Sequence, residues 1–340
     1  MHQILGDRHN FGRSTYRTVV NGKTLIHKPR PVFWEWLFFG IDSPLKEALD
    51  QDLETLLAGI FKLDVSDPFS LHLGQVKEIE RSNSIIDNVT FEKYAALTAY
   101  CTFWGISDLH ESNLLKTDDL FLPVDIECVF MPIVLPNETG LLPHKNIPED
   151  KCLFRKFEFL SQNTGVSQNF ISRFAKTFLD LSQKNSAFSI ALLKFADFIA
   201  ECPVRILLRP TSLYAAALEA ENLTAISDFL PEEVEQLIRG DIPYFFTKLS
   251  DQSVFFYSSD KFKTSKIANS SPVKIASLIS NLDQLLNLSR QQQLFINSML
   301  WLAKKIGNGS FSLADSTWNL QRTADQIELS FIDQKFIAKC

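Results

Sequence analysis

The sequence predicts an α+β fold with two lobes, in which a β-rich first third is followed by a mostly helical remainder. Three observations lead to this prediction. Strand-forming segments near the start are joined by Asn21-Gly22, the strongest short-range hairpin signal. From residue 150 onward, apolar residues recur mainly at three- and four-residue spacing, which is typical of helices. The chain also has 340 residues, 45% of them hydrophobic, which is enough for a large core divided between two lobes.

The composition excludes several classes of protein. A formal charge of -6 provides no global basic field that would attract nucleic acid. The most apolar windows, 32–41 and 128–136, are short and interrupted by Glu or Pro, so we expect no stable membrane insertion. Five widely spaced cysteines form no C-x-x-C pair, which favours a reducing compartment over a disulfide framework or a structural zinc site. We therefore expect a cytoplasmic protein with buried, apolar thiols.

The predicted N-lobe, residues 1–95, begins with a glycine-bounded loop over residues 6–12. Segments 15–20 and 23–28 are predicted strands on either side of the tight turn, and Lys28 ends the second of them. A strand, a glycine-bounded loop, a strand, a tight turn and a strand with a Lys form the layout of the nucleotide-binding lobe of kinases. In that lobe the loop covers the nucleotide phosphates and the Lys holds them.

Residues 44–62 are predicted to form one amphipathic helix with Pro44 in its first turn, because six Leu and Ile residues recur at helical spacing. In a kinase-like lobe, the helix that follows the Lys strand supplies a Glu that pairs with the Lys. Glu47 and Glu54 are the candidates for this pairing, and the sequence does not choose between them. For either Glu, a solvated position on the polar face of the helix is the alternative.

The predicted C-lobe, residues 96–340, opens within a buried helix over 91–106. A pair of short strands is predicted over 113–130, with Asp118-Asp119 at the turn between them. Further helices are predicted at about 168–182, 186–200, 213–220 and 231–239, and residues 275–305 are predicted to form one long amphipathic helix or a pair of helices.

The pattern Asp-x-His-x-x-Asn directly follows the buried helix. Phosphoryl transfer needs a carboxylate that orients the attacking hydroxyl and an amide oxygen that helps to hold Mg²⁺. Asp108 and Asn113 are five residues apart, as in the protein-kinase catalytic loop, and Asp125 stands about where a kinase has its metal-binding Asp. Glu127 is either a further metal ligand or a solvated neighbour. Taken alone, a histidine such as His110 is more often a hydrogen-bonded structural residue than a catalytic one.

A second group of polar residues is foreign to ordinary kinases. Asp7 and His9 repeat the Asp-x-His spacing inside the first loop. Far downstream, Arg205 and Arg209 stand on a predicted apolar strand and turn, shortly before Thr211. Cations are costly in such a strand unless they meet anions. The anion is either a ligand or an acidic neighbour, and the sequence leaves both open.

Taken together, these motifs resemble the dehydratase domain of class II lanthipeptide synthetases, the LanM enzymes. In chain order the motifs are G-D-R-H-N-F-G-R (6–13), K-P-R (28–30), D-L-H-E-S-N (108–113), D-I-E (125–127), R-x-x-x-R-P-T-x-x-Y (205–214) and G-D-I-P-Y-F (240–245). A late Q-x-x-F-I-x-S-M (292–299) is similar to the closing helix of the family. The resemblance therefore spans nearly the whole chain.

The resemblance implies a lipid-kinase-like fold and an ATP- and Mg²⁺-dependent lantibiotic dehydratase. Such an enzyme phosphorylates Ser or Thr of a ribosomally made precursor peptide and then eliminates phosphate to leave dehydroamino acids. By this resemblance, Lys28 holds the nucleotide phosphates, and Asp108 orients or deprotonates the substrate hydroxyl with His110 close by. The residues implied for Mg²⁺ are Asn113, Asp125 and Glu127. The residues implied for elimination are Asp7, His9, Arg205 and Thr211.

The sequence departs from the LanM pattern in three places. We expect neither the helical region that precedes the first motif in the family nor the C-terminal cyclase with its zinc site. In addition, LHLGQVKEIER (71–81) stands where the family has an aromatic Y-G-W stretch. We therefore expect a stand-alone dehydratase, with cyclisation left to another protein or absent, and with a separate leader-binding protein as a further candidate partner. Two alternatives stay open, namely a kinase without elimination and a degenerate module that binds a peptide without chemistry.

Overall fold

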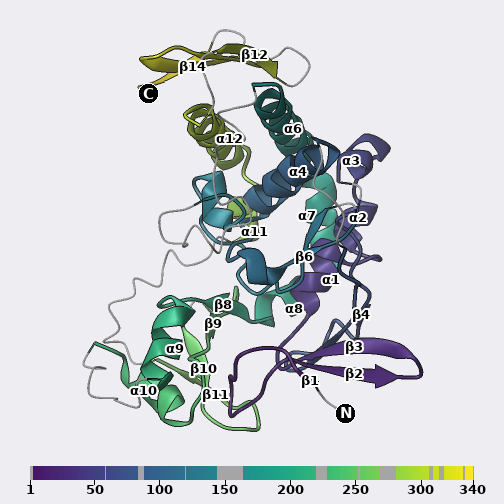
Figure 1. The fold of residues 1–340 in the computed structure, drawn as a ribbon, viewed down its shortest axis with the longest axis vertical. Coiled ribbons are helices and arrows are strands. Elements are labelled where there is room, and N and C mark those ends of the chain that lie inside the picture. Colours follow the sequence, from purple (N-terminus) through teal and green to yellow (C-terminus); the bar gives the residue numbers. More distant parts are fainter. Residues whose placement is uncertain are drawn as a thin grey trace. The chain divides into compact units, whose positions relative to one another are not determined.

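The structure, a computed structural model, is shown in Figure 1. It describes residues 3–57, 59–82, 88–118, 120–143, 164–219, 228–251, 253–267, 281–305, 309–313, 318–331 and 334–339. The chain divides into two compact units. The first unit comprises Met1–Ile41, Leu63–Ile79 and Phe195–Ile279, and the second comprises Asp42–Lys62, Glu80–Lys194 and Ser280–Cys340. Each unit draws on residues before and after residue 95, and the lobe boundary at that position stays a prediction.

The first unit contains a five-stranded antiparallel sheet, which we call the N-terminal sheet. In spatial order its strands are β1 (Gln3–Ile4), β2 (Tyr16–Val20), β3 (Lys23–Lys28), β5 (Gly74–Lys77) and β4 (Val65–Ser66). Asn21 and Gly22 join β2 to β3 with φ values of 51° and 74°. These positive values are what a tight hairpin turn of this kind requires, so the predicted hairpin is confirmed.

Helix α1 (Phe33–Phe39) follows β3 and is buried along its whole length. A helix that is apolar on every side must be enclosed by other elements of the protein. The ring of Phe33 lies 4.7 Å from that of Phe198, centroid to centroid, and the indole nitrogen of Trp34 donates to the backbone oxygen of Pro203 at 2.7 Å. This packing holds the single acidic residue of the helix in the interior of the first unit.

The first unit also has a second antiparallel sheet. The sequence predicts only one of its strands, the one at Val204–Ile206. In spatial order its strands are β11 (Thr264–Lys266), β10 (Phe255–Tyr257), β9 (Phe245–Thr247) and β8 (Val204–Ile206). The helices that neighbour β8 along the chain are α8 (Ala196–Glu201), α9 (Thr211–Glu219) and α10 (Pro231–Ile238). The helices predicted over 213–220 and 231–239 are thereby confirmed as α9 and α10.

Helices dominate the second unit. They are α2 (Pro44–Glu47), α3 (Gln51–Leu56), α4 (Asn88–Trp104), α6 (Thr164–Gln183), α7 (Asn185–Leu193), α11 (Leu282–Leu285) and α12 (Leu288–Ala303). The rings of Phe103, Phe178 and Phe295 connect α4, α6 and α12, with centroid distances of 5.7 and 5.8 Å between successive rings. The helices predicted over 91–106 and 168–182 are confirmed. Within the described ranges, no helix is long and apolar enough to cross a membrane.

Two segments predicted as single helices are interrupted. Residues 44–62 form α2 and α3 because Ser43 and Asp50 each cap a helix start, accepting a backbone N–H at 3.1 and 2.9 Å. The segment 186–200 divides into α7 and α8, where Phe195 leaves the helical conformation with φ of -122° and ψ of 16°.

The last described residues form a four-stranded antiparallel sheet that the sequence analysis does not predict. In spatial order its strands are β12 (Gly309–Leu313), β13 (Trp318–Arg322), β14 (Gln326–Phe331) and β15 (Gln334–Lys339). α6 and α12 pack against this sheet (Figure 1). The expected helical remainder is therefore corrected, while an α+β fold with a sheet-rich N-terminal region and a largely helical C-terminal part is confirmed.

Gly105 makes the turn between α4 and the segment that carries Asp108. Its φ is 65°, and an added Cβ would lie 2.4 Å from the backbone oxygen of Met131. We expect Gly105→Ala to lower the free energy of unfolding by about 3 kcal/mol, because left-handed strain and overpacking each contribute about 1–3 kcal/mol. Urea unfolding measures this loss. Gly22→Ala is the control, because Gly22 shares the positive φ but has no atom within 4 Å of the added Cβ. Equal losses in both variants would mean that the Met131 contact contributes nothing.

Candidate active site

The end of β3 places Lys28 in a buried ion pair. Its Nζ lies 3.0 Å from Oε1 of Glu35 in α1, and the two side chains are only 7% and 0% exposed. This pairing corrects the sequence analysis, which considered Glu47 and Glu54. Both of those residues are exposed and belong to the second unit. The signal that was missed is a Glu inside the otherwise apolar run of α1.

Arg30 holds the same carboxylate. Its two terminal nitrogens donate to Oε2 and Oε1 of Glu35 at 3.1 and 2.5 Å, and one of them also donates to the backbone oxygen of Pro31 at 2.7 Å. We call Lys28, Arg30 and Glu35 the ion triad. Desolvating charges is expensive, so a buried group of this kind is an inefficient way to stabilise a fold. A buried group of charges that does not mainly serve stability indicates a functional position.

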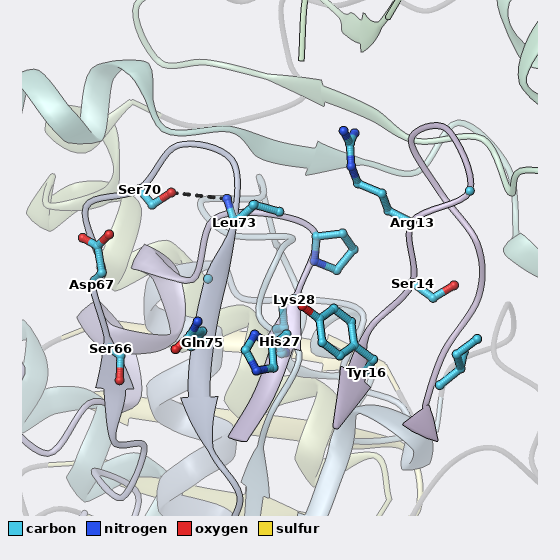
Figure 2. Close-up of a pocket in the computed structure, with 14 residues that line it drawn as sticks. Arg13, Ser14, Tyr16, His27, Lys28, Ser66, Asp67, Ser70, Leu73 and Gln75 are labelled. Carbon is cyan, nitrogen blue, oxygen red and sulfur yellow. Dashed lines mark hydrogen bonds between the residues drawn. The ribbon is translucent and has the colours of Figure 1, made fainter. Parts of the chain in front are cut away.

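A pocket of about 860 Å³ opens on the N-terminal sheet (Figure 2). Its floor is one row of side chains across all five strands, because directly paired residues in adjacent strands point to the same face. The row consists of Ile4, Tyr16, His27, Gln75 and Ser66. The rings of Tyr16 and His27 are parallel, with centroids 4.6 Å apart, and Figure 2 shows them side by side in the pocket.

Lys28 borders this pocket, but its side chain belongs to the other face of the sheet. It follows His27 in β3 and pairs with Gly74 in β5. Because successive residues of a strand point to opposite faces, the ion triad and the pocket floor lie on the two faces of one sheet. The predicted nucleotide lysine is therefore not at the centre of the pocket, and the sequence analysis does not anticipate the pocket floor.

The first loop is held by a residue 230 positions away along the chain. The carboxylate of Asp241 accepts the backbone N–H groups of Phe11 and Gly12, each at 2.8 Å, and Asp241 is completely buried. Asn10, Phe11 and Gly12 have positive φ values of 49°, 69° and 76°. The conformation is free of strain for Gly12 but unfavourable for residues with a Cβ, above all Phe11, and the two hydrogen bonds to Asp241 help to hold the loop in it.

His9 has a defined orientation in this loop. Its Nδ1 lies 2.8 Å from the backbone oxygen of Ile242, and because that oxygen only accepts, Nδ1 carries a proton. In the neutral ring, Nε2 is then the basic nitrogen. The rings of His9 and Tyr244 are 5.8 Å apart, and the guanidinium of Arg205 lies 5.2 Å from the centre of the same Tyr244 ring. The structure thus places two residues predicted for elimination, His9 and Arg205, next to the same Tyr244 ring.

The other residues of this group are placed differently. Asp7 is exposed on the loop, and Thr211 is half-buried at the first residue of α9. Arg209 contacts an acidic neighbour, because its Nε donates to Oε1 of Glu233 at 3.0 Å. The hydroxyl of Tyr214 donates to the same carboxylate. Burial and then this hydrogen bond raise the pKa of Tyr214 well above its usual range.

In the second unit, Asp108, His110 and Asn113 lie in one short loop. Nδ2 of Asn113 donates to the backbone oxygen of Asp108 at 2.7 Å, and His110 Nε2 lies 3.9 Å from Asp108 Oδ1. The side chains of Asp108 and His110 are 27% and 28% exposed, so a substrate can reach them. Asp108 has a φ of 63°, which is uncommon for a residue with a Cβ and is often found at functional sites.

A short hairpin brings Asp125 to the same loop. Its strands are β6 (Leu114–Lys116) and β7 (Phe121–Pro123), which confirm the predicted strand pair. Asp118 lies in the turn between them, whereas Asp119 is outside the described residues. Beyond the last strand pair, the backbone N–H of Val124 donates to the backbone oxygen of Asn113 at 3.0 Å. Asp125 is the next residue after Val124, so its main chain lies beside Asn113 at the open end of the hairpin.

The donor atoms at this end of the hairpin suit Mg²⁺. The amide nitrogen of Asn113 is turned toward the backbone of Asp108, so its oxygen is the atom that can meet a cation. Asp125, which is half-buried, and Glu127, which is buried, carry carboxylates in the segment that directly follows the hairpin. Among the residues described by the structure, no group of three or more His, Cys, Asp or Glu residues could hold a metal ion alone. Mg²⁺ is commonly held by one or two carboxylates together with substrate phosphates, so the donor set fits an ion that binds with a nucleotide.

The three cysteines that the structure describes offer no reactive thiol at these sites. Cys101, Cys128 and Cys202 are buried thiols, as the sequence analysis predicts. Burial raises the pKa of Cys101 and Cys202 well above the usual range, and a protonated thiol is a poor nucleophile and a poor metal ligand. Cys152 and Cys340 lie outside the described residues.

A family model described as a domain of unknown function (DUF4135) matches residues 1–164. The matched range includes the first loop, the ion triad, the loop of Asp108 and the hairpin that leads to Asp125. Arg205 and Asp241 lie beyond it. No curated protein matches the chain.

Proposed function

We propose that this protein is a LanM-like lantibiotic dehydratase with a kinase-like fold, that is, an ATP-dependent peptide Ser/Thr kinase and phospho-lyase. The buried pair of Lys28 and Glu35 carries the proposal. In kinases, an ion pair between a strand Lys and a helix Glu positions the nucleotide phosphates. Here the Lys ends a strand that follows a glycine-bounded loop and a tight hairpin. Asp108, Asn113 and Asp125 then follow in kinase order.

In the proposed first step, the hydroxyl of a peptide Ser or Thr attacks the γ-phosphate of ATP. Asp108 orients this hydroxyl or accepts its proton, with His110 beside it. A bond forms between the hydroxyl oxygen and the phosphorus while the bond from phosphorus to ADP breaks, so the peptide gains the phosphate and ADP leaves. Lys28, held by Glu35, is assigned to the nucleotide phosphates.

Asn113, Asp125 and Glu127 are assigned to Mg²⁺. When bound, the ion neutralises negative charge on the phosphates during transfer. The hydrogen bond from Asn113 to the backbone of Asp108 supports this assignment, because it leaves the amide oxygen for the cation. The same bond links the metal ligands to the residue assigned to the substrate hydroxyl.

In the proposed second step, a base removes the α-proton of the phosphorylated residue. The C–H electron pair forms the Cα=Cβ double bond, and phosphate departs with the electron pair of the Cβ–O bond. Phosphate is a far better leaving group than hydroxide, which is why phosphorylation comes first. Arg205 is suited to stabilise the departing phosphate, and Asp7, His9 and Thr211 are assigned to the same step. The approach of His9 and Arg205 to one Tyr244 ring supports this grouping.

The proposal is tested with the purified protein, ATP, Mg²⁺ and a Ser- and Thr-rich precursor peptide encoded by a neighbouring gene. Intact masses followed over time are expected to show a phosphopeptide that rises and then falls as peptides lighter by one water per modified residue appear. Phosphopeptide that accumulates without loss of water would identify a kinase without elimination. Unchanged ATP and peptide would identify a peptide-binding module. A separate cyclase and a cytoplasmic location are part of the same proposal.

Arg205→Ala is expected to leave phosphorylation in place and to slow elimination by about 10²–10³-fold, the usual cost of losing one stabilising group in the transition state. Phosphopeptide then accumulates. The rate at which it loses phosphate, followed by intact mass, measures the effect. Arg173→Ala is the control, because Arg173 pairs with Glu92 in the second unit. If Arg205→Ala loses both activities equally, the assignment of Arg205 to elimination is wrong.

A further inference from the structure

We propose that Asp241 is a positioning residue for the elimination step, because its buried carboxylate holds the first loop in the conformation that presents His9. This inference rests on the proposed function, since its main effect is visible only if the protein eliminates phosphate. It concerns a residue outside both the predicted site residues and the range matched by the family model.

Asp241 is built into the fold as a rigid support. Its backbone N–H donates to the backbone oxygen of Gln236 in α10 at 3.0 Å, so the residue is fixed to the end of a helix. Its Oδ2 and Oδ1 accept the N–H groups of Phe11 and Gly12, one each. Arg239 lies 3.4 Å from Oδ2, and its guanidinium also covers the Phe11 ring at 4.0 Å. Arg239 thus supplies a positive charge beside the carboxylate, and each carboxylate oxygen accepts one hydrogen bond from the loop.

The next residue, Ile242, contacts the part of the first loop that carries His9. The backbone N–H of Ile242 donates to the backbone oxygen of Arg8 at 2.8 Å, and its backbone oxygen accepts from His9 Nδ1. Two consecutive residues, Asp241 and Ile242, therefore fix the main chain on either side of His9, and Ile242 also sets which ring nitrogen of the neutral His9 carries the proton. Tyr244 follows in the same segment and lies next to the His9 ring.

Loss of the Asp241 carboxylate would release a loop that has three successive positive φ values. His9 would then lose its defined position relative to Tyr244 and Arg205. A misplacement of about 1 Å costs about 10²-fold in rate, even when it originates away from the reacting atoms. Phosphorylation is expected to lose less, because the ion triad is held by its own contacts among Lys28, Arg30 and Glu35.

Asp241→Asn tests the inference with almost no change in shape. The amide NH₂ replaces one of the two acceptor oxygens and meets a backbone N–H donor. The substrate is the precursor peptide synthesised with phosphoserine and supplied without ATP. Phosphate release is expected to be about 10²-fold slower than in the wild type, a clearly larger loss than in ATP-dependent phosphorylation of the unmodified peptide. Hydrogen exchange of the amides in residues 8–13 is expected to be faster.

Asp251→Asn is the matched control. Asp251 lies in the same unit, accepts the N–H of Ser253 at 3.0 Å and pairs with Lys266, but it does not contact the first loop in the described part of the structure. This variant is expected to retain wild-type phosphate release and wild-type exchange in residues 8–13.

Gly12→Ala provides a second variant, which disturbs the loop and leaves the buried carboxylate intact. Its φ is 76°, and an added Cβ would lie 2.7 Å from a terminal nitrogen of Arg8. A larger loss of elimination than of phosphorylation is expected here too, so the inference stays testable even if Asp241→Asn does not fold. Wild-type phosphate release in the folded variants overturns the inference, and so does equal loss of both activities. If the wild-type protein releases no phosphate, the proposed function is wrong. Faster exchange in Asp241→Asn then still upholds the anchoring of the loop, and unchanged exchange overturns it.

Discussion

Asp108→Asn is expected to slow phosphoryl transfer to the peptide by about 10²–10⁴-fold, the usual contribution of a positioned acid or base. Asn has the same shape as Asp but does not accept a proton from the attacking hydroxyl. The backbone can stay as it is, because Asn tolerates the left-handed conformation found at this position. The hydrogen bond from Asn113 is also kept, since it goes to the main chain. A lower rate would therefore report on the carboxylate.

The measurement is the initial rate of phosphopeptide formation with ATP and Mg²⁺. Combining the substitution with Arg205→Ala keeps the phosphopeptide from being consumed. The control is Asp118→Asn, which changes an exposed Asp at the turn of the hairpin that follows the loop. If Asp108→Asn transfers phosphate at the wild-type rate, the assignment of the Asp-x-His-x-x-Asn pattern to the substrate hydroxyl is wrong.

Glu35→Gln has the largest expected effect on stability. Removing the carboxylate leaves Lys28 and Arg30 buried without the counter-charge that both contact. Breaking a buried ion pair from one side costs about 3–5 kcal/mol, so the free energy of unfolding should fall by about that amount. Urea unfolding measures it, and phosphoryl transfer should be lost at the same time because Lys28 loses its support.

Two comparisons separate charge burial from function. Glu47→Gln and Glu54→Gln change exposed residues and are expected to alter the free energy of unfolding by no more than about 0.5 kcal/mol. Replacing the whole ion triad with Lys28→Met, Arg30→Met and Glu35→Leu is expected to restore much of the stability but none of the phosphoryl transfer. A Glu35→Gln variant as stable as the wild type would contradict this account of the triad.

Local signals in the sequence were sufficient for part of the fold. The Asn21-Gly22 turn demands positive φ, and the apolar spacing over 91–106 demands a helix, so both elements were predictable. The break between α2 and α3 occurs where Asp50 caps the start of α3. The apolar spacing continues through this position, so the sequence pattern by itself predicts one unbroken helix. The sheet of β12–β15 was missed although β13 and β14 alternate buried and exposed residues, because no strong turn signals mark where one strand ends and the next begins.

The candidate site divides in the same way. The loop of Asp108 and the hairpin that leads to Asp125 are local, and their residue spacing predicts that they lie together. The partner of Lys28 is also near in sequence, but Glu35 was hidden in a run of aromatic residues that indicates only burial. The contact of Asp241 with the first loop spans 230 residues, and no local pattern in a single sequence predicts a pairing at that distance.

Phosphorylation followed by elimination moves the oxygen of the modified serine into inorganic phosphate. A precursor peptide with heavy oxygen in its serine hydroxyl therefore tests the proposed function most directly, in a reaction with the wild-type protein, ATP and Mg²⁺. The proposed chemistry predicts that the phosphate released carries the heavy oxygen, with one labelled phosphate for each water lost from the peptide. Release of unlabelled phosphate with no change in the mass of the peptide would contradict it.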